Sequence, residues 1–203
     1  MIVEKIAGQT LAPIKAEHSI SHQNWVEAAQ VSAAFSISHD GSSIYLIYHV
    51  TEDQVRAVNT EYNSAVWDDS CVEFFLSLET DGENYYNFEF NAIGTVLGAY
   101  GKNRNQREWL SESLLSQVQT APSLGRQVIE SLEETTSWTL QVRIPVQVLN
   151  FSGVKDLSGM DGHANFYKCG DKLKQPHFLS WKPVILPSPD FHQPRFFGQL
   201  SFL

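Results

Sequence analysis

The sequence predicts an all-β protein, specifically a jelly-roll-like β-sandwich of two antiparallel sheets with one short helix. Short stretches that alternate apolar and polar side chains recur along most of the chain, which is the period-two signature of half-buried strands. Turn-forming residues separate these stretches. Aromatic residues make up 12% of the chain, and they favour strands and sandwich cores.

The first third of the chain contains a lead-in segment and a hairpin. Residues 1–31 show little regular pattern, and we interpret them as a segment that packs on the body through Trp25. Residues 33–38 and 43–50 alternate as strands around a turn at Asp40, where an Asp-Gly pair favours a hairpin. The chain of 203 residues is long enough for one large sandwich, so we expect a single domain over 1–203.

A second hairpin is predicted from 70–78 and 84–91, around Asp81 and Gly82. One face of each strand is apolar and should point into the core: Val72, Phe74, Leu76 and Leu78, then Tyr86, Phe88 and Phe90. Further strands are expected at 95–100, 116–120, 126–133, 137–144, 163–169, 177–182 and 195–202. The one helix is expected just after Pro145, because proline is well placed in a first helical turn.

The charge balance excludes several classes of partner. With 14 basic and 23 acidic residues the formal charge is −9, which disfavours nucleic acid and anionic membranes. No apolar run approaches ~18 residues, so membrane insertion is not expected. The first residues lack the pattern of a secretion signal, and this predicts a cytoplasmic location unless a signal has been removed.

The sequence suggests no obligatory cofactor. Cys71 and Cys169 lack metal-site spacing and are expected to be buried free thiols, although they could pair. The seven histidines form no zinc motif. Met160, the one internal methionine, lies in a glycine-rich loop and argues against haem.

Two clusters carry residues suited to binding a sugar. In AVWDDSCVEFF, Trp67 and Glu73 are six residues apart and share a face if the strand extends that far. A flat indole stacks on the C–H face of a pyranose while a carboxylate bonds its hydroxyl groups. Farther along the chain, His163 and Asn165 share a strand face, and Trp181 ends the next strand near a loop. Core tryptophans and solvated polar residues would give the same pattern.

An enzyme remains an alternative to a binding module. A glycosidase needs two carboxylates flanking one bond. Asp68 and Asp69 are adjacent and point to opposite faces of a strand, whereas Glu73 and Glu89 could meet across neighbouring strands. Binding without catalysis is favoured, because sandwiches of this kind seldom carry catalysis.

The ordered set of motifs resembles family 9 carbohydrate-binding modules from about residue 32 to the C-terminus. The matching segments are WDDSCVEFFL, YYNFEFNAIG, WTLQVRIP, ANFYKCG, HFLSWKPV and PDFHQPRFFGQLSF. The resemblance implies a β-sandwich in which Trp67 and Trp181 clamp the end of a glycan, with hydrogen bonds from Glu73 and Asn91. This sequence departs from the family pattern at Glu89 and His163, where the family often carries arginines.

The resemblance also implies a setting and a range of ligands. It implies a mono- or oligosaccharide ligand, such as a fragment of xylan or cellulose, and action beside separate glycoside hydrolases in polysaccharide breakdown. It allows a structural calcium ion, for which the oxygen ligands available in turn-like contexts are Asp68, Asp69, Asp81 and Asp171. The remaining alternative is a structural or partner-binding sandwich that has lost its sugar.

Overall fold

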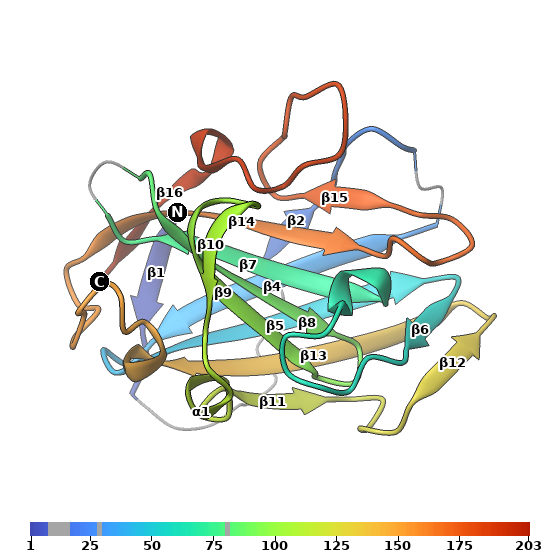
Figure 1. Cartoon of the computed structure of the whole chain (residues 1–203), viewed down its shortest axis with the longest axis horizontal. Helices are drawn as coiled ribbons and strands as arrows, with labels where there is room; N and C mark the ends of the chain where they lie inside the picture. Colours follow the sequence, from blue (N-terminus) through green and yellow to red (C-terminus); the bar gives the residue numbers. More distant parts are fainter. Residues whose placement is uncertain (8–16, 28–29, 80–81) are drawn as a thin grey trace.

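Two curled sheets packed face to face make up the protein (Figure 1). The computed structural model describes residues 1–7, 17–27, 30–79 and 82–203. The first sheet has the order β10-β9-β8-β7-β14-β16-β1, with β15 beside β14 and β3 beside β15. The second has the order β1-β4-β5-β13-β11, with β2 beside β4. Strand β1 pairs in parallel with β16 and with β4 and so joins the two sheets.

The strands of the first sheet are β1 (Ile2–Lys5), β3 (His22–Gln23), β7 (Cys71–Ser77), β8 (Tyr85–Asn91), β9 (Val96–Asn103), β10 (Gln106–Trp109), β14 (Asp161–Cys169), β15 (Phe178–Ser180) and β16 (Gly198–Phe202). The second sheet adds β2 (His18–Ile20), β4 (Ser32–His39), β5 (Ser43–Glu52), β11 (Gln119–Pro122) and β13 (Thr136–Pro145). Strands β6 (Val55–Ala57) and β12 (Ile129–Leu132) pair separately.

The main hydrophobic core lies between the two sheets. The inward residues of β7 and β8 are those that the alternation predicts: Val72, Phe74, Leu76, Tyr86, Phe88 and Phe90 are fully buried there. They meet residues of the second sheet such as Leu46, Tyr48 and Val50 on β5. The predicted all-β sandwich is confirmed.

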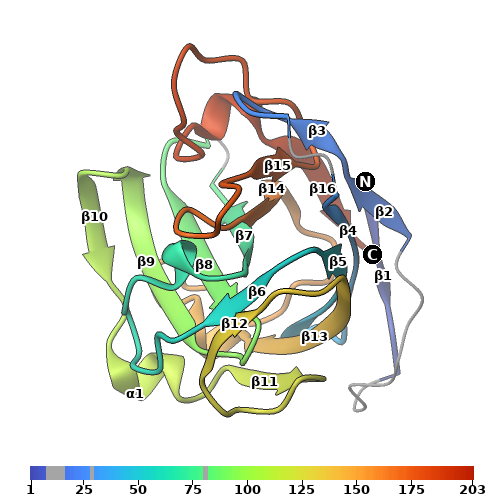
Figure 2. The same ribbon diagram turned by 90° about the vertical axis from the view of Figure 1, so that its right-hand side faces the viewer.

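The first sheet is also covered on its outer face. Cys71, Phe75 and Tyr167 form a second buried cluster on that face, together with Phe191. The long segment after β15 crosses this face and supplies Phe191 (Figure 2). This sheet is therefore buried on both sides, and its outer side has room for a binding site.

Two sequence predictions need correction. The lead-in segment contains regular structure, because β1, β2 and β3 pair with strands distant in sequence. Pro145 is followed by a single 3-10 turn, Val146–Val148, and the one α-helix among the described residues is Glu112–Leu115, capped by Ser111. The predicted turn at Asp81 lies outside the described residues. No helix among the described residues is long and apolar enough to cross a membrane.

Candidate functional site

A cavity of about 460 Å³ opens on the outer face of the first sheet. Its floor comes from β7, β8, β10 and β14, and its walls come from loops. The lining residues are Trp25, Trp67, Glu73, Glu89, Arg104, Arg107, Cys169, Asp171, Phe178, Pro189, Asp190, Phe191 and His192. Aromatic rings, carboxylates and guanidinium groups thus line the same cavity, and its volume is in the range of pockets that bind small ligands.

Trp67 reaches the cavity from a 3-10 turn, Val66–Asp68, that directly precedes β7. The turn is held from below by Asp69, which is fully buried and forms an ion pair with Arg56. The other carboxylate oxygen of Asp69 accepts hydrogen bonds from the amides of Val58 and Asn59, at 3.1 and 3.0 Å. The local sequence therefore fixes the tryptophan on a rigid support.

Trp25 forms another wall of the cavity. Its indole Nε1 donates a 2.7 Å hydrogen bond to the carbonyl of Leu186, and its ring lies 5.5 Å from Phe191 and 5.8 Å from Phe178. Its backbone has φ of 65°, a left-handed conformation that costs a non-glycine residue of order 1–3 kcal/mol. The surrounding contacts hold this strained backbone and fix the ring toward the loop that borders the cavity.

Two carboxyl groups lie side by side on the floor. Glu73 on β7 and Glu89 on β8 are direct cross-strand partners, and both are almost fully buried. Burial and the neighbouring Glu89 charge raise the pKa of Glu73 well above its usual range. Burial raises the pKa of Glu89 to about 7, although Arg107, with Nη1 3.9 Å from Oε1, opposes the shift. Near neutral pH Glu89 can therefore accept or donate a hydrogen bond.

Two arginines from the β9–β10 hairpin line the cavity, opposite residues 189–192 of the loop that follows β15. Arg104 forms an ion pair with Asp190 at 3.3 Å. Arg107 Nη1 lies 3.4 Å from Nε2 of His192, whose Nδ1 lies 2.9 Å from the Tyr85 hydroxyl. Burial and the two arginines lower the pKa of His192 to about 3, so the ring is neutral. A guanidinium only donates, so Nε2 accepts and Nδ1 carries the proton.

The predicted pairing of Trp67 with Trp181 is not present, because the two rings lie on opposite faces of the first sheet. Trp181 packs edge-on against Phe35 and Phe166 of the main core, with centroid distances of 6.0 and 5.8 Å. The ammonium of Lys182 lies 4.3 Å from its ring centroid. Trp181 follows Leu179 by two residues and lies on the same inward side, although β15 itself ends at Ser180.

Three polar residues that the sequence placed at the site do not line the cavity. Asn91 donates at 2.9 Å to Asp69, and its role is to brace the Trp67 turn. Asn165 is fully buried and bonds the backbone N–H and carbonyl of Lys182 at 2.9 and 3.0 Å. His163 is on β14 opposite Ser77 and does not line the cavity. Glu73 and Glu89 do line it, as predicted.

Sequence reasoning missed Trp25, the two arginines and the loop residues Asp190 to His192 as cavity residues. Arg107 and Trp109 are two residues apart on β10 and so share one face of the strand, which is the one local sign in the sequence that this strand could carry a binding surface. Nothing in the sequence near Trp25 indicates that the lead-in segment reaches the same cavity, because β3 and β15 are more than 150 residues apart.

The aspartates suggested for calcium do not form a calcium site among the described residues. Asp69 is saturated by Arg56 and three N–H donors. Asp68 bonds the ammonium of Lys172 at 2.8 Å. Calcium requires 6–8 oxygen ligands, and neither Asp68 nor Asp69 belongs to a cluster of metal-ligand side chains among the described residues. Asp171 lines the cavity, and Asp81 lies outside the described residues.

Fold and cavity together define a β-sandwich binding module for a small polar ligand. The chain belongs to carbohydrate-binding family 9, whose family model matches residues 9–202. Family membership supports noncatalytic carbohydrate binding. Among curated proteins, no relative matches the chain.

Solved structures agree with this assignment. The chain is similar to a candidate carbohydrate-binding protein from Bacteroides uniformis, with 39% identity, a TM-score of 0.91, and coverage of 100% of this chain and 98% of that one. Two structures of a family 9 module from Caldicellulosiruptor kristjanssonii, with glucose and with cellotriose, have TM-scores of 0.62 and 0.64 at 14% and 13% identity. They cover 100% of this chain, and 95% and 92% of theirs, and share its fold.

Proposed function

We propose that the chain binds one sugar residue, at a glycan end or in a short oligosaccharide, in the cavity between Trp67 and Trp25. The observation that carries this proposal is the convergence of two indole rings with two buried carboxyl groups and two guanidinium groups. Sugars combine an apolar C–H face with a rim of hydroxyl groups, and this cavity offers partners for both.

The polar side chains that line the cavity can form hydrogen bonds with the neutral hydroxyl groups of a sugar. Arg104 and Arg107 donate hydrogen bonds, Asp190 accepts them, and Glu89 can do either near neutral pH. The two arginines supply cationic donors although Glu89 and His163 occupy the positions where the family resemblance leads us to expect arginines. Because Trp25 lines the cavity, the proposed binding unit includes the segment 1–31 and thus the whole chain.

Hydrolysis is the second candidate, because Glu73 and Glu89 are neighbours in the cavity with raised pKa values. A retaining pair flanks the glycosidic bond, with one group protonating the leaving oxygen while the other attacks the anomeric carbon. Glu73 and Glu89 rise from the same sheet face and meet a ligand from one side. This geometry favours hydrogen bonding over cleavage.

Isothermal calorimetry with glucose, cellobiose, cellotriose and xylo-oligosaccharides tests the proposal. Trp67→Ala and Trp25→Ala should each abolish measurable binding, whereas Trp181→Phe should retain it because its ring packs in the core. Tyr62→Ala, an exposed aromatic outside the cavity, is the matched control. No binding to any sugar would support a sandwich that has lost its ligand, and release of chromogen from aryl glycosides, abolished in Glu73→Gln, would establish a hydrolase.

The biological setting that we propose is polysaccharide breakdown, in which the chain retains fragments of cellulose or xylan for separate glycoside hydrolases. The glucose and cellotriose bound by the Caldicellulosiruptor kristjanssonii module make β-glucans the first ligands to test. A chain-end site predicts that affinity changes little from cellotriose to longer oligomers. Affinity that rises steadily with length would point to an extended groove instead.

A further inference from the structure

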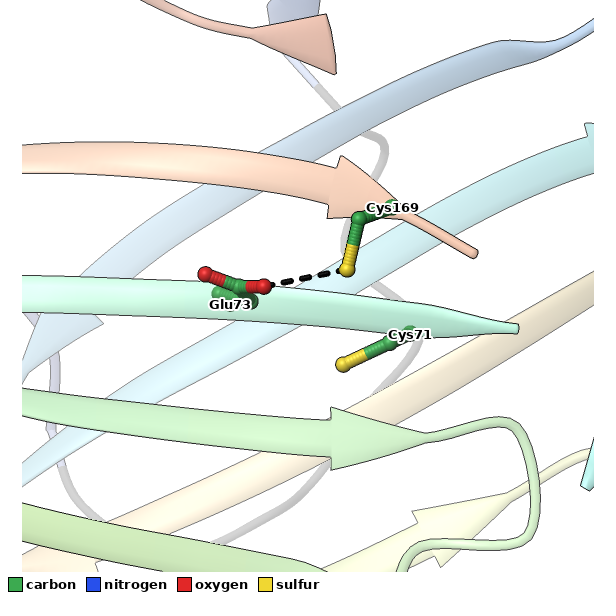
Figure 3. A group of neighbouring side chains, drawn as sticks. All are labelled: Cys71, Glu73 and Cys169. Atoms are coloured by element: carbon green, nitrogen blue, oxygen red, sulfur yellow. Dashed lines mark hydrogen bonds between the residues drawn. The ribbon is translucent and has the colours of Figure 1, made fainter. Parts of the chain in front are cut away.

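Two cysteines and a glutamate meet at the floor of the cavity. Cys71 on β7 lies opposite Cys169 on β14 in the strand register, and Glu73 lies two residues after Cys71 on the same face. The two Sγ atoms and a Glu73 carboxylate oxygen all lie within 4.8 Å of one another, and all three residues are buried (Figure 3). The Cys169 thiol donates to Oε1 of Glu73 at 3.0 Å.

We propose that Cys71, Glu73 and Cys169 bind one zinc ion, with its fourth coordination position directed into the cavity. Zinc bonds sulfur at about 2.3 Å and oxygen at about 2.0–2.2 Å, so tetrahedral ligand atoms lie roughly 3.5–4 Å apart. The ligand atoms lie within 4.8 Å of one another, so side-chain shifts of about 1 Å bring them to this spacing. On binding, the ion displaces the thiol protons of Cys71 and Cys169, and any proton on Glu73, to solvent, and so replaces the hydrogen bond that Cys169 donates to Glu73.

The surroundings favour a cation at this point. Glu89 lies directly across from Glu73, and its Oε2 is buried without a hydrogen-bond partner. The Arg107 guanidinium is 3.9 Å from the other oxygen of Glu89. Neighbouring buried carboxylates are costly to ionise, and a divalent ion bound beside them offsets that cost.

The donor set selects the metal. Two thiolates are soft ligands that suit zinc, whereas calcium and magnesium take oxygen ligands only. Three protein ligands leave a position open, as in zinc sites that bind a water or a substrate oxygen. Glu73 and Cys169 line the cavity, while Cys71 lies behind them, so the open position faces the cavity. The ion site does not depend on sugar binding.

Cobalt(II) is the probe, because it replaces zinc and gives absorption bands from thiolate ligation. The full chain is reduced, freed of metal by a chelator and titrated with Co²⁺ in the absence of sugar. We expect thiolate-to-cobalt charge-transfer bands that saturate at about one ion per chain and disappear when Zn²⁺ is added. Absence of these bands in the reduced wild-type chain overturns the proposal.

Variants assign the ligands. Cys71→Ser and Cys169→Ser should each lose the thiolate bands of the wild-type site, and Glu73→Gln should weaken Co²⁺ binding by at least about tenfold. Asp68→Asn and His22→Ala, two potential ligands outside the cluster, should bind as the wild type does. Circular dichroism checks each fold, and Cys→Ala variants replace any serine variant that does not fold. Unchanged bands in Cys169→Ser or Cys169→Ala would overturn the assignment, and sugar calorimetry gives an independent result.

Discussion

The support of the Trp67 turn leads to a quantitative prediction for Asp69→Asn. In the wild type, Asp69 pairs with Arg56 and accepts hydrogen bonds from Val58, Asn59 and Asn91. All four groups are donors, so the asparagine amide nitrogen must face at least one of them. A buried donor without a partner costs about 1–3 kcal/mol. Breaking a buried ion pair costs about 3–5 kcal/mol in total.

We therefore expect the free energy of unfolding of Asp69→Asn to fall by about 3–5 kcal/mol. For a chain of this size, 1 kcal/mol shifts Tm by about 2–4 °C, so Tm should fall by roughly 6–20 °C. Urea denaturation followed by tryptophan fluorescence measures the first quantity, and calorimetry measures the second. Displacement of the turn should also weaken sugar binding, because Trp67 rests on it.

The adjacent residue provides the matched control. Asp68 pairs with Lys172, whose side chain is 64% exposed, so Asp68→Asn should change the free energy of unfolding by no more than about 1 kcal/mol. If the Asp69 and Asp68 variants have equal stability, the buried network does not hold the turn, and the reasoning fails.

Three further predictions concern the floor, the hairpin and the core. Folded Glu89 keeps its proton up to about pH 7, whereas unfolded Glu89 loses it near pH 4.5, so the wild type loses stability as pH rises between these values. Glu89→Gln lacks this proton, so in chelator-treated buffer its free energy of unfolding should gain about 3 kcal/mol relative to the wild type from pH 4.5 to 7. The free energies of unfolding are measured by urea denaturation at each pH, and a difference between the two proteins that stays constant over this range would contradict the prediction. Gly101→Ala should weaken sugar binding measured by calorimetry, because its Cβ would lie 2.5 Å from the Arg107 backbone and displace β10; unchanged affinity argues against a role for that strand. Trp138→Phe should lower the free energy of unfolding by about 1–3 kcal/mol, because the buried Glu52 carboxylate loses a 2.8 Å hydrogen bond; an unchanged urea midpoint refutes it.

The period-two pattern was sufficient to predict the fold and the inward faces of the central strands. Phe88 lies between the polar residues Asn87 and Glu89, and both Phe74 and Phe88 lie in the main core as expected. The same pattern put Glu73 and Glu89 on the opposite face, where both line the cavity. Strand geometry alone imposes these placements, because each residue reverses the direction of the side chain.

Helical and irregular segments were less predictable. The helix expected after Pro145 is a single 3-10 turn, whereas the α-helix Glu112–Leu115 has only four residues. Four residues cannot show a helical period, and the sequence carries a signal only at the Ser111 cap. Strand β1 is equally hidden, because its four residues are too few to show a period and its partners are β4 and, at the other end of the chain, β16.

By itself the sequence determined the class of fold, the alternation of faces and the presence of Trp67 beside Glu73. Only the tertiary structure decided which tryptophan accompanies Trp67. The first sheet is buried on both faces, so polarity does not mark which face a tryptophan beyond a strand end will take. The course of the loops around β15 decides it, and those loops bring Trp25 to the cavity and leave Trp181 packed against the main core.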